Sequence, residues 1–126
     1  MAYRVSKAEF MDLVDSAVSD LPEEFARFLE EVPIEVHDLP TRSQQERVKG
    51  DRGSLLLGLY VGRPRTKRSV EDSGAMPDVI YLFQKNIETI CESEAQLVEQ
   101  VRKTVLHEIG HHFGMSEEDL DALGYG

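Results

Sequence analysis

The chain has 126 residues, a length that fits one compact domain, and we therefore expect residues 1–126 to form a single domain. Its 24 Asp and Glu outnumber its 14 Lys and Arg, and the net charge of -10 argues against nucleic acids and anionic membranes as partners. A composition with 40% hydrophobic and 30% charged residues is that of a folded, soluble protein.

Neither the amino terminus nor the cysteine content indicates export. Acidic residues interrupt the first fifteen positions, where a secretory signal requires an apolar run. The longest apolar stretch, residues 55–61, is far shorter than the about 20 residues that a membrane helix requires. Cys91 is the single cysteine, so an intramolecular disulfide cannot form. These features predict a cytoplasmic protein.

Two consecutive helices are predicted at the amino end. Ser6 and Glu9 have the spacing of a capping box, which satisfies the first backbone donors of a helix. Pro22 suits the first position of a second helix that continues to Glu31. The apolar stripe of the first helix follows the three- and four-residue spacing: Phe10, Leu13, Val14, Ala17 and Leu21.

The apolar period changes to two after Glu31, which predicts a strand with one buried face over residues 32–37. His37 falls on its outer face beside Glu35, where we expect an exposed side chain. The polar residues 41–53 read as a loop, and the apolar residues 54–61 and 79–83 as two further strands. A charged connection over residues 63–74 joins these two strands.

A long helix and a short helix are predicted near the carboxyl end. Ser93 and Gln96 form a second capping-box candidate, and the helical apolar pattern runs from there to a stop at Gly114. Ser116 then caps a last helix that is closed by Gly124. Helices at both ends of the chain and strands in its middle favour an α+β fold, with a short central β-sheet of about three strands packed on helices.

The long helix carries an HExxH motif. His107 and His111 are about 40° apart around the helix axis and roughly 6 Å apart along it, so both imidazoles can reach one metal ion, for which zinc is the best fit. Glu108 is offset from His107 by about 100°, where its carboxylate can act as general base on a water at the metal. The alternative is that two histidines have this spacing by chance and one of them is an ordinary core residue, which a capped helix with an apolar opposite face disfavours.

A catalytic zinc ion takes a third protein ligand. Only fifteen residues follow His111, which excludes a ligand from a long downstream helix. Gly114 permits the backbone to reverse, as in the HExxHxxGxxH pattern, and the third-ligand position of that pattern is Glu117. Glu118, Asp119 or a water remain alternatives, because Ser116 and the acids after it also make an ordinary helix start.

The segment from His107 to Gly114, with the acidic cluster after it and Leu123-Gly124-Tyr125, resembles the minimal zincin-like metallopeptidases, small single-domain bacterial proteins. The pattern of that family is HExxHxxGxxD, in which the histidines and the Asp bind zinc and the Glu is the catalytic base. The resemblance implies a small α+β zincin-like fold with a cleft between the sheet and the motif helix, and zinc peptidase activity. Glu117 stands where the family has Asp, which places the carboxylate one methylene farther from the backbone.

The sequence therefore predicts a zinc-dependent metallopeptidase that hydrolyses peptide bonds in a peptide or a specific protein segment, acting as a monomer or weak homo-oligomer. An extended substrate can add to a sheet edge as a further strand. The alternative from another class is a non-catalytic zincin-like module that binds a metal or a partner protein. A third hypothesis is a hydrolase of non-peptide amides, because the same activation of water by a metal would support that reaction.

Overall fold

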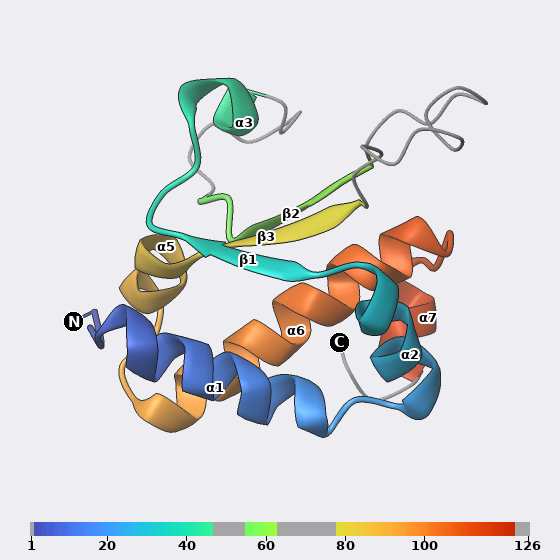
Figure 1. Ribbon diagram of the computed structural model, residues 1–126, viewed down its shortest axis with the longest axis horizontal. Coiled ribbons are helices and arrows are strands. Elements are labelled where there is room, and N and C mark those ends of the chain that lie inside the picture. Colours follow the sequence, from blue (N-terminus) through green and yellow to red (C-terminus); the bar gives the residue numbers. More distant parts are fainter. Residues whose placement is uncertain (1, 47–54, 63–77, 123–126) are drawn as a thin grey trace.

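The computed structural model describes residues 2–46, 55–62 and 78–122, without the side chains of Glu117, Leu120 and Asp121. The predicted connection over residues 63–74 and the predicted helix end at Gly124 lie outside the described residues. In chain order the described residues form α1 (Lys7–Ser19), α2 (Glu23–Glu31), β1 (Ile34–His37), α3 (Arg42–Glu46), β2 (Gly58–Val61), β3 (Val79–Phe83), α5 (Gln84–Thr89), α6 (Glu94–His112) and α7 (Glu117–Ala122) (Figure 1).

The sheet has three strands in the order β1-β3-β2. The central strand β3 pairs in parallel with β1 and in antiparallel with β2. Val79, Ile80, Leu82 and Phe83 of β3 are completely buried, as expected for a strand flanked on both sides. The predicted α+β fold, a short sheet packed on helices, is confirmed.

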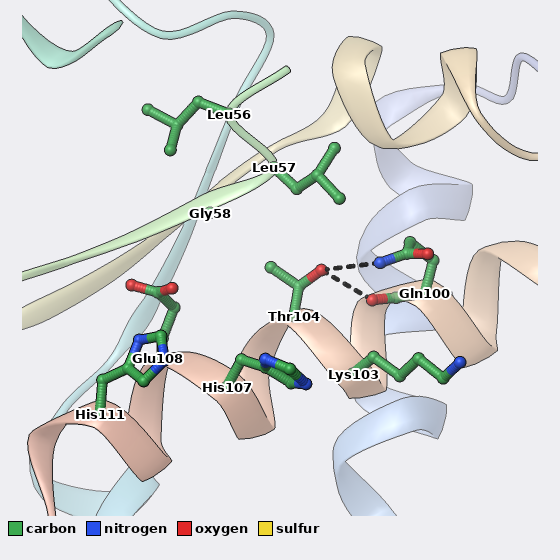
Figure 2. Close-up of a pocket in the computed structure, with 9 residues that line it drawn as sticks. All are labelled: Leu56, Leu57, Gly58, Gln100, Lys103, Thr104, His107, Glu108 and His111. Carbon is green, nitrogen blue, oxygen red and sulfur yellow. Dashed lines mark hydrogen bonds between the residues drawn. The ribbon is translucent and has the colours of Figure 1, made fainter. Parts of the chain in front are cut away.

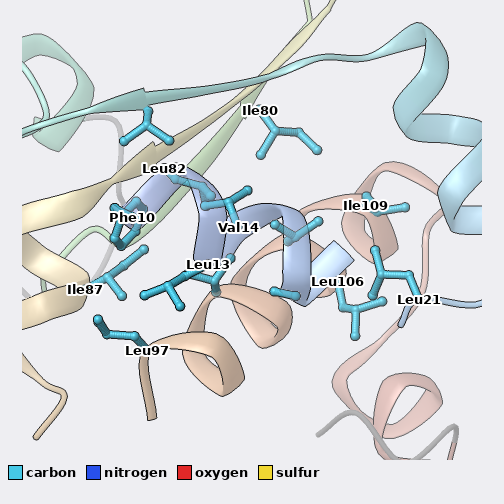
Figure 3. Packing of buried hydrophobic residues seen from close by; sticks show 14 of the residues in the cluster. Phe10, Leu13, Val14, Leu21, Ile80, Leu82, Ile87, Leu97, Leu106 and Ile109 are labelled. Carbon is cyan, nitrogen blue, oxygen red and sulfur yellow. The ribbon is translucent and has the colours of Figure 1, made fainter. Parts of the chain in front are cut away.

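Helices α1 and α6 pack against each other and cover one face of the sheet (Figure 1). Burial of each large apolar side chain at their interface contributes roughly 1.5–3 kcal/mol to folding. Among the described residues, no helix is long and apolar enough to cross a membrane. Figure 3 shows the resulting core, which includes Phe10, Leu13, Val14, Leu21, Ile80, Leu82, Ile87, Leu97, Leu106 and Ile109.

Both long helices begin where their capping residues predict. The Ser6 hydroxyl oxygen accepts the Glu9 N–H at 3.1 Å before α1, and the Ser93 hydroxyl oxygen accepts the Gln96 N–H at 3.2 Å before α6. At the other end of α6, Gly114 has a φ of 74°, the left-handed conformation that glycine adopts without strain. These local signals place α6, and with it the HExxH motif, in the fold.

The prediction of a loop over residues 41–53 is wrong for Arg42–Glu46, which form α3. The Thr41 hydroxyl oxygen accepts the Gln44 N–H at 3.1 Å, and the Gln44 side-chain oxygen accepts the Thr41 N–H at 2.9 Å. This reciprocal pair is a capping box, which stabilises a helical turn even where no apolar stripe marks one.

Two other boundaries also differ from the predictions. The regular part of the second strand is β2, Gly58–Val61, and the described residues 55–57 before it are not paired as a strand. The helix α5, Gln84–Thr89, follows β3 directly and was not predicted, because it has no side-chain cap and buries Gln84, Asn86 and Glu88 in place of an apolar stripe. The place of α5 in the fold depends on tertiary hydrogen bonds.

Gly58 lets β2 approach α6 closely. A Cβ atom at this position would lie 2.6 Å from the Cγ2 atom of Thr104 and 3.1 Å from the carbonyl oxygen of Tyr81. Both neighbours are held in place, because Thr104 is buried on α6 and Tyr81 belongs to the central strand. The strand and the helix can therefore keep this spacing only without a side chain at residue 58.

We expect Gly58→Ala to lower the free energy of unfolding by about 1–3 kcal/mol, because the added methyl group overpacks the contact with Thr104. Urea denaturation measures this loss. The matched control is Gly62→Ala, whose Cβ would meet nothing closer than 3.8 Å. Adding Thr104→Ser to Gly58→Ala removes the clashing methyl group and should restore part of the loss; a double variant as unstable as the single one would contradict this explanation.

Candidate active site

The side chains of the HExxH motif lie in the last two turns of α6. His107 and His111 are one helical turn apart, and their ring centroids are separated by 6.2 Å with an interplanar angle of 79°. His107 is half-buried, whereas His111 is exposed. Figure 2 shows both rings on the same stretch of helix, with the Glu108 carboxylate pointing toward the strand that contains Gly58.

A pocket of about 400 Å³ lies between these side chains and the segment that leads into β2. It is an open pocket on the surface, so a ligand can enter it without any movement of the core. Its lining residues come from two places in the sequence that the fold brings together: Leu56, Leu57, Gly58, Gln100, Lys103, Thr104, His107, Glu108 and His111 (Figure 2).

Glu108 is held by the backbone of β2. The Tyr60 N–H donates a hydrogen bond of 2.7 Å to Oε1 of Glu108, and within the described part of the chain Oε2 has no hydrogen-bond partner. Burial raises the pKa of the Glu108 carboxyl above its ordinary value, an effect that the Tyr60 N–H and the nearby His111 and His107 oppose. One carboxylate oxygen is thus fixed, and the side chain lines the pocket, a geometry that suits a group that accepts and returns a proton.

The edge position of β2 makes this hydrogen bond possible. Leu57 accepts from Phe83 of the central strand, so alternate residues of β2, including Gly58 and Tyr60, direct their backbone groups away from β3. An N–H at a sheet edge has no strand partner, and at Tyr60 the carboxylate of Glu108 takes that place.

The side chain of Tyr60 fixes the same strand to the end of α6. Its hydroxyl donates a hydrogen bond of 2.5 Å to Asp78, just before β3, and its ring stacks on His112 with centroids 4.8 Å apart. His112 also contacts Phe28 of α2, at 5.0 Å between ring centroids. His112 therefore packs between β2 and α2, and it does not line the pocket.

The third ligand indicated by the sequence stays a prediction. Glu117 is the first residue of α7, and its side chain lies outside the described residues, as does Tyr125. Asp119 accepts the Ser116 N–H at 2.9 Å and donates its own N–H to the Ser116 hydroxyl oxygen at 3.1 Å, which is the capping box of α7. Among the side chains that the structure describes, no group of three His, Cys, Asp or Glu is placed to hold a metal ion, and the alternatives Glu118 and Asp119 also stay predictions.

His37 is exposed on β1, as predicted, 3.4 Å from Glu35, and it does not line the pocket. Sequence reasoning missed the residues that surround the motif, above all Tyr60 and Asp78. Their contribution is a backbone N–H and a hydroxyl contact between segments far apart in the chain, for which the sequence contains no local signal.

Comparison with known proteins agrees with this geometry. The family model described as zincin-like metallopeptidase matches residues 29–126, which include β1, the whole sheet and the motif helix. Among solved structures, a conserved hypothetical protein from Thermus thermophilus has the same fold, with a TM-score of 0.58 and 19% sequence identity over 86% of this chain and 94% of that one. No curated protein matches the sequence significantly. The HExxH helix lies against an edge strand, and the family model matches about three quarters of the chain. This chain therefore belongs to the zincin-like metallopeptidases.

Proposed function

We propose that the protein is a zinc-dependent peptidase in which His107 and His111 bind the ion, Glu117 is the third ligand and Glu108 is the general base. The observation that carries this proposal is the state of Glu108: one carboxylate oxygen is fixed by the Tyr60 N–H, and the side chain lines the same pocket as the two imidazoles. The family to which the chain belongs supports zinc and peptidase chemistry at the same place.

The described residues fit a zinc ion. Two imidazoles on one tetrahedral zinc ion, with Zn–N distances of about 2.0–2.1 Å, have ring centroids about 5 Å apart. The observed separation of 6.2 Å is about 1 Å larger, so the rings of His107 and His111 would have to turn toward each other to share an ion. Both are donors that zinc prefers, and both line the same pocket.

When bound, zinc supplies Lewis acidity that makes water acidic and polarises a carbonyl group. Glu108 takes the proton of the attacking water on Oε2 and later returns it to the leaving amine, so one carboxylate serves as base and then as acid. The Tyr60 N–H keeps this carboxylate pointed at the pocket throughout.

The edge of β2 provides the place for an extended substrate. The outward-facing backbone groups of Gly58 lie at the pocket, and a peptide can pair with them as an added strand. Backbone pairing holds a peptide in register without restricting its sequence, so specificity has to come from the pocket.

Metal analysis of the purified protein tests the proposal. We expect zinc bound with a stoichiometry of one, and we expect His107→Ala to weaken zinc binding by about a hundredfold or more, because a ligand of the ion is lost. The matched control is His112→Ala, which removes a neighbouring imidazole of the same helix that packs on Tyr60. This variant should keep its zinc and lose stability.

Equal loss of zinc in both variants, or no zinc binding by the unaltered protein, would contradict the assignment of ligands. Zinc binding without cleavage of any peptide in a diverse library would favour a non-catalytic metal-binding module instead. The two results are separate, because zinc content and peptide cleavage are measured independently.

A further inference from the structure

We propose that Lys103 makes the pocket selective for a substrate carboxylate on the carboxyl-terminal side of the bond that is cleaved. This inference rests on the proposed peptidase function and names the substrate class of that site. Lys103 lines the pocket on α6, one turn before His107 (Figure 2).

The other residues that line the pocket leave the Lys103 ammonium group as the candidate that binds a substrate carboxylate. Leu56 and Leu57 form an apolar wall opposite α6. The Gln100 side chain donates to the Thr104 hydroxyl oxygen at 3.3 Å, and that hydroxyl donates to the Gln100 carbonyl at 2.8 Å, so these polar groups bind each other (Figure 2).

Among the described residues, Lys103 has no such partner. Its neighbour Arg102 forms an ion pair with Glu99, whereas Lys103 forms no ion pair with any acid in the part of the chain that the structure describes. A lysine that lines this pocket and has no acidic partner among the described residues can bind an anion from outside the chain in spite of the net negative charge. A substrate carboxylate supplies that anion with the geometry of a charge-assisted hydrogen bond.

The direction of β2 decides which side of the substrate Lys103 meets. Gly58 lies against Thr104, and Tyr60 lies against Glu108, so β2 and α6 run in the same direction. A peptide that adds to β2 in the more stable antiparallel sense runs the opposite way. Its residues after the cleaved bond then lie over Leu57 and toward Lys103.

The distance limits the position of the carboxylate. Lys103 precedes His107 by four residues, about 6 Å along the helix axis, and an extended peptide advances about 3.3 Å per residue. Figure 2 shows the Lys103 side chain extending along α6 away from His107, so the carboxylate belongs at the earliest to the second residue after the cleaved bond. It can be an acidic side chain or the terminal carboxylate of the peptide.

The test measures binding, so it does not depend on cleavage. Zinc-loaded Glu108→Gln protein is titrated by calorimetry with four octapeptides of one sequence that end in Glu or in Gln, each with a free or an amidated carboxyl terminus. We expect a peptide with the recognised carboxylate to bind about tenfold more tightly than its uncharged counterpart. A difference between Glu and Gln identifies an acidic side chain, and a difference between free and amidated termini identifies the terminal carboxylate.

Lys103→Met in the same background should abolish this difference, and Lys103→Arg should keep it. Lys85→Met is the matched control, because Lys85 is an exposed lysine on α5 outside the pocket, and it should leave the preference unchanged. Equal binding of all four peptides, absence of binding, or a preference that survives Lys103→Met would overturn the proposal. If the preference is present but the unaltered protein cleaves none of these peptides or a diverse library, the peptidase function fails and the carboxylate site stands.

Discussion

Glu108→Gln is expected to lower the rate of peptide cleavage by about 10³-fold while zinc binding stays unchanged. General acid–base catalysis by a placed side chain contributes about 10²–10⁴-fold, and an amide cannot take a proton from water at neutral pH. Glutamine preserves the shape of the side chain and can still accept the Tyr60 N–H through its amide oxygen. The fold and the pocket should therefore persist.

Single-turnover cleavage assays and zinc analysis on the same preparation measure the two effects separately. Glu94→Gln is the matched control, since Glu94 is an exposed acid in the first turn of α6, at the opposite end from the motif. It should leave both cleavage and zinc content unchanged. Retained activity in Glu108→Gln would remove this residue from the mechanism, and loss of zinc would mean that Glu108 binds the metal.

Glu88→Ala is expected to lower the free energy of unfolding by about 3 kcal/mol. The Glu88 side chain is 2% exposed, and its carboxylate accepts hydrogen bonds from the Val5 N–H at 2.9 Å, from Gln84 at 3.1 Å and from Arg4 at 3.2 Å. Truncation removes the acceptor of the Val5 N–H and one of the hydrogen bonds of Gln84 and of Arg4, and it opens a cavity at a buried position. The segment before α1, which contains Arg4 and Val5, should then no longer be held to α5 through Glu88.

Urea denaturation at neutral pH measures this change. Glu30→Ala is the control, because Glu30 is exposed on α2, and its loss should change stability by no more than about 0.5 kcal/mol. A change of that small size for Glu88→Ala would show that the network adds little to stability. Zinc binding should persist in Glu88→Ala under native conditions, because Glu88 does not line the pocket.

The elements that sequence reasoning found are those with signals inside a single segment. Ser6 and Ser93 cap helices with marked apolar stripes, and the apolar residues of β3 form the central strand with the bounds expected. The helices that it missed had no such signal or a weak one. In α5, Glu88 occupies a buried position, and a charged residue in the core is stable there only because the distant Arg4 and Val5 bind it.

The same distinction holds for the candidate site. The spacing of His107, Glu108 and His111 follows from helix geometry alone, so the sequence by itself determined that these side chains share one end of α6 and indicated the family to which the chain belongs. Only the tertiary structure decided that the Tyr60 N–H fixes Glu108 and that Lys103 lines the pocket beside it. The physical reason is that both depend on how closely β2 approaches α6, a distance set by the bare backbone of Gly58 against Thr104 and by packing across the whole core.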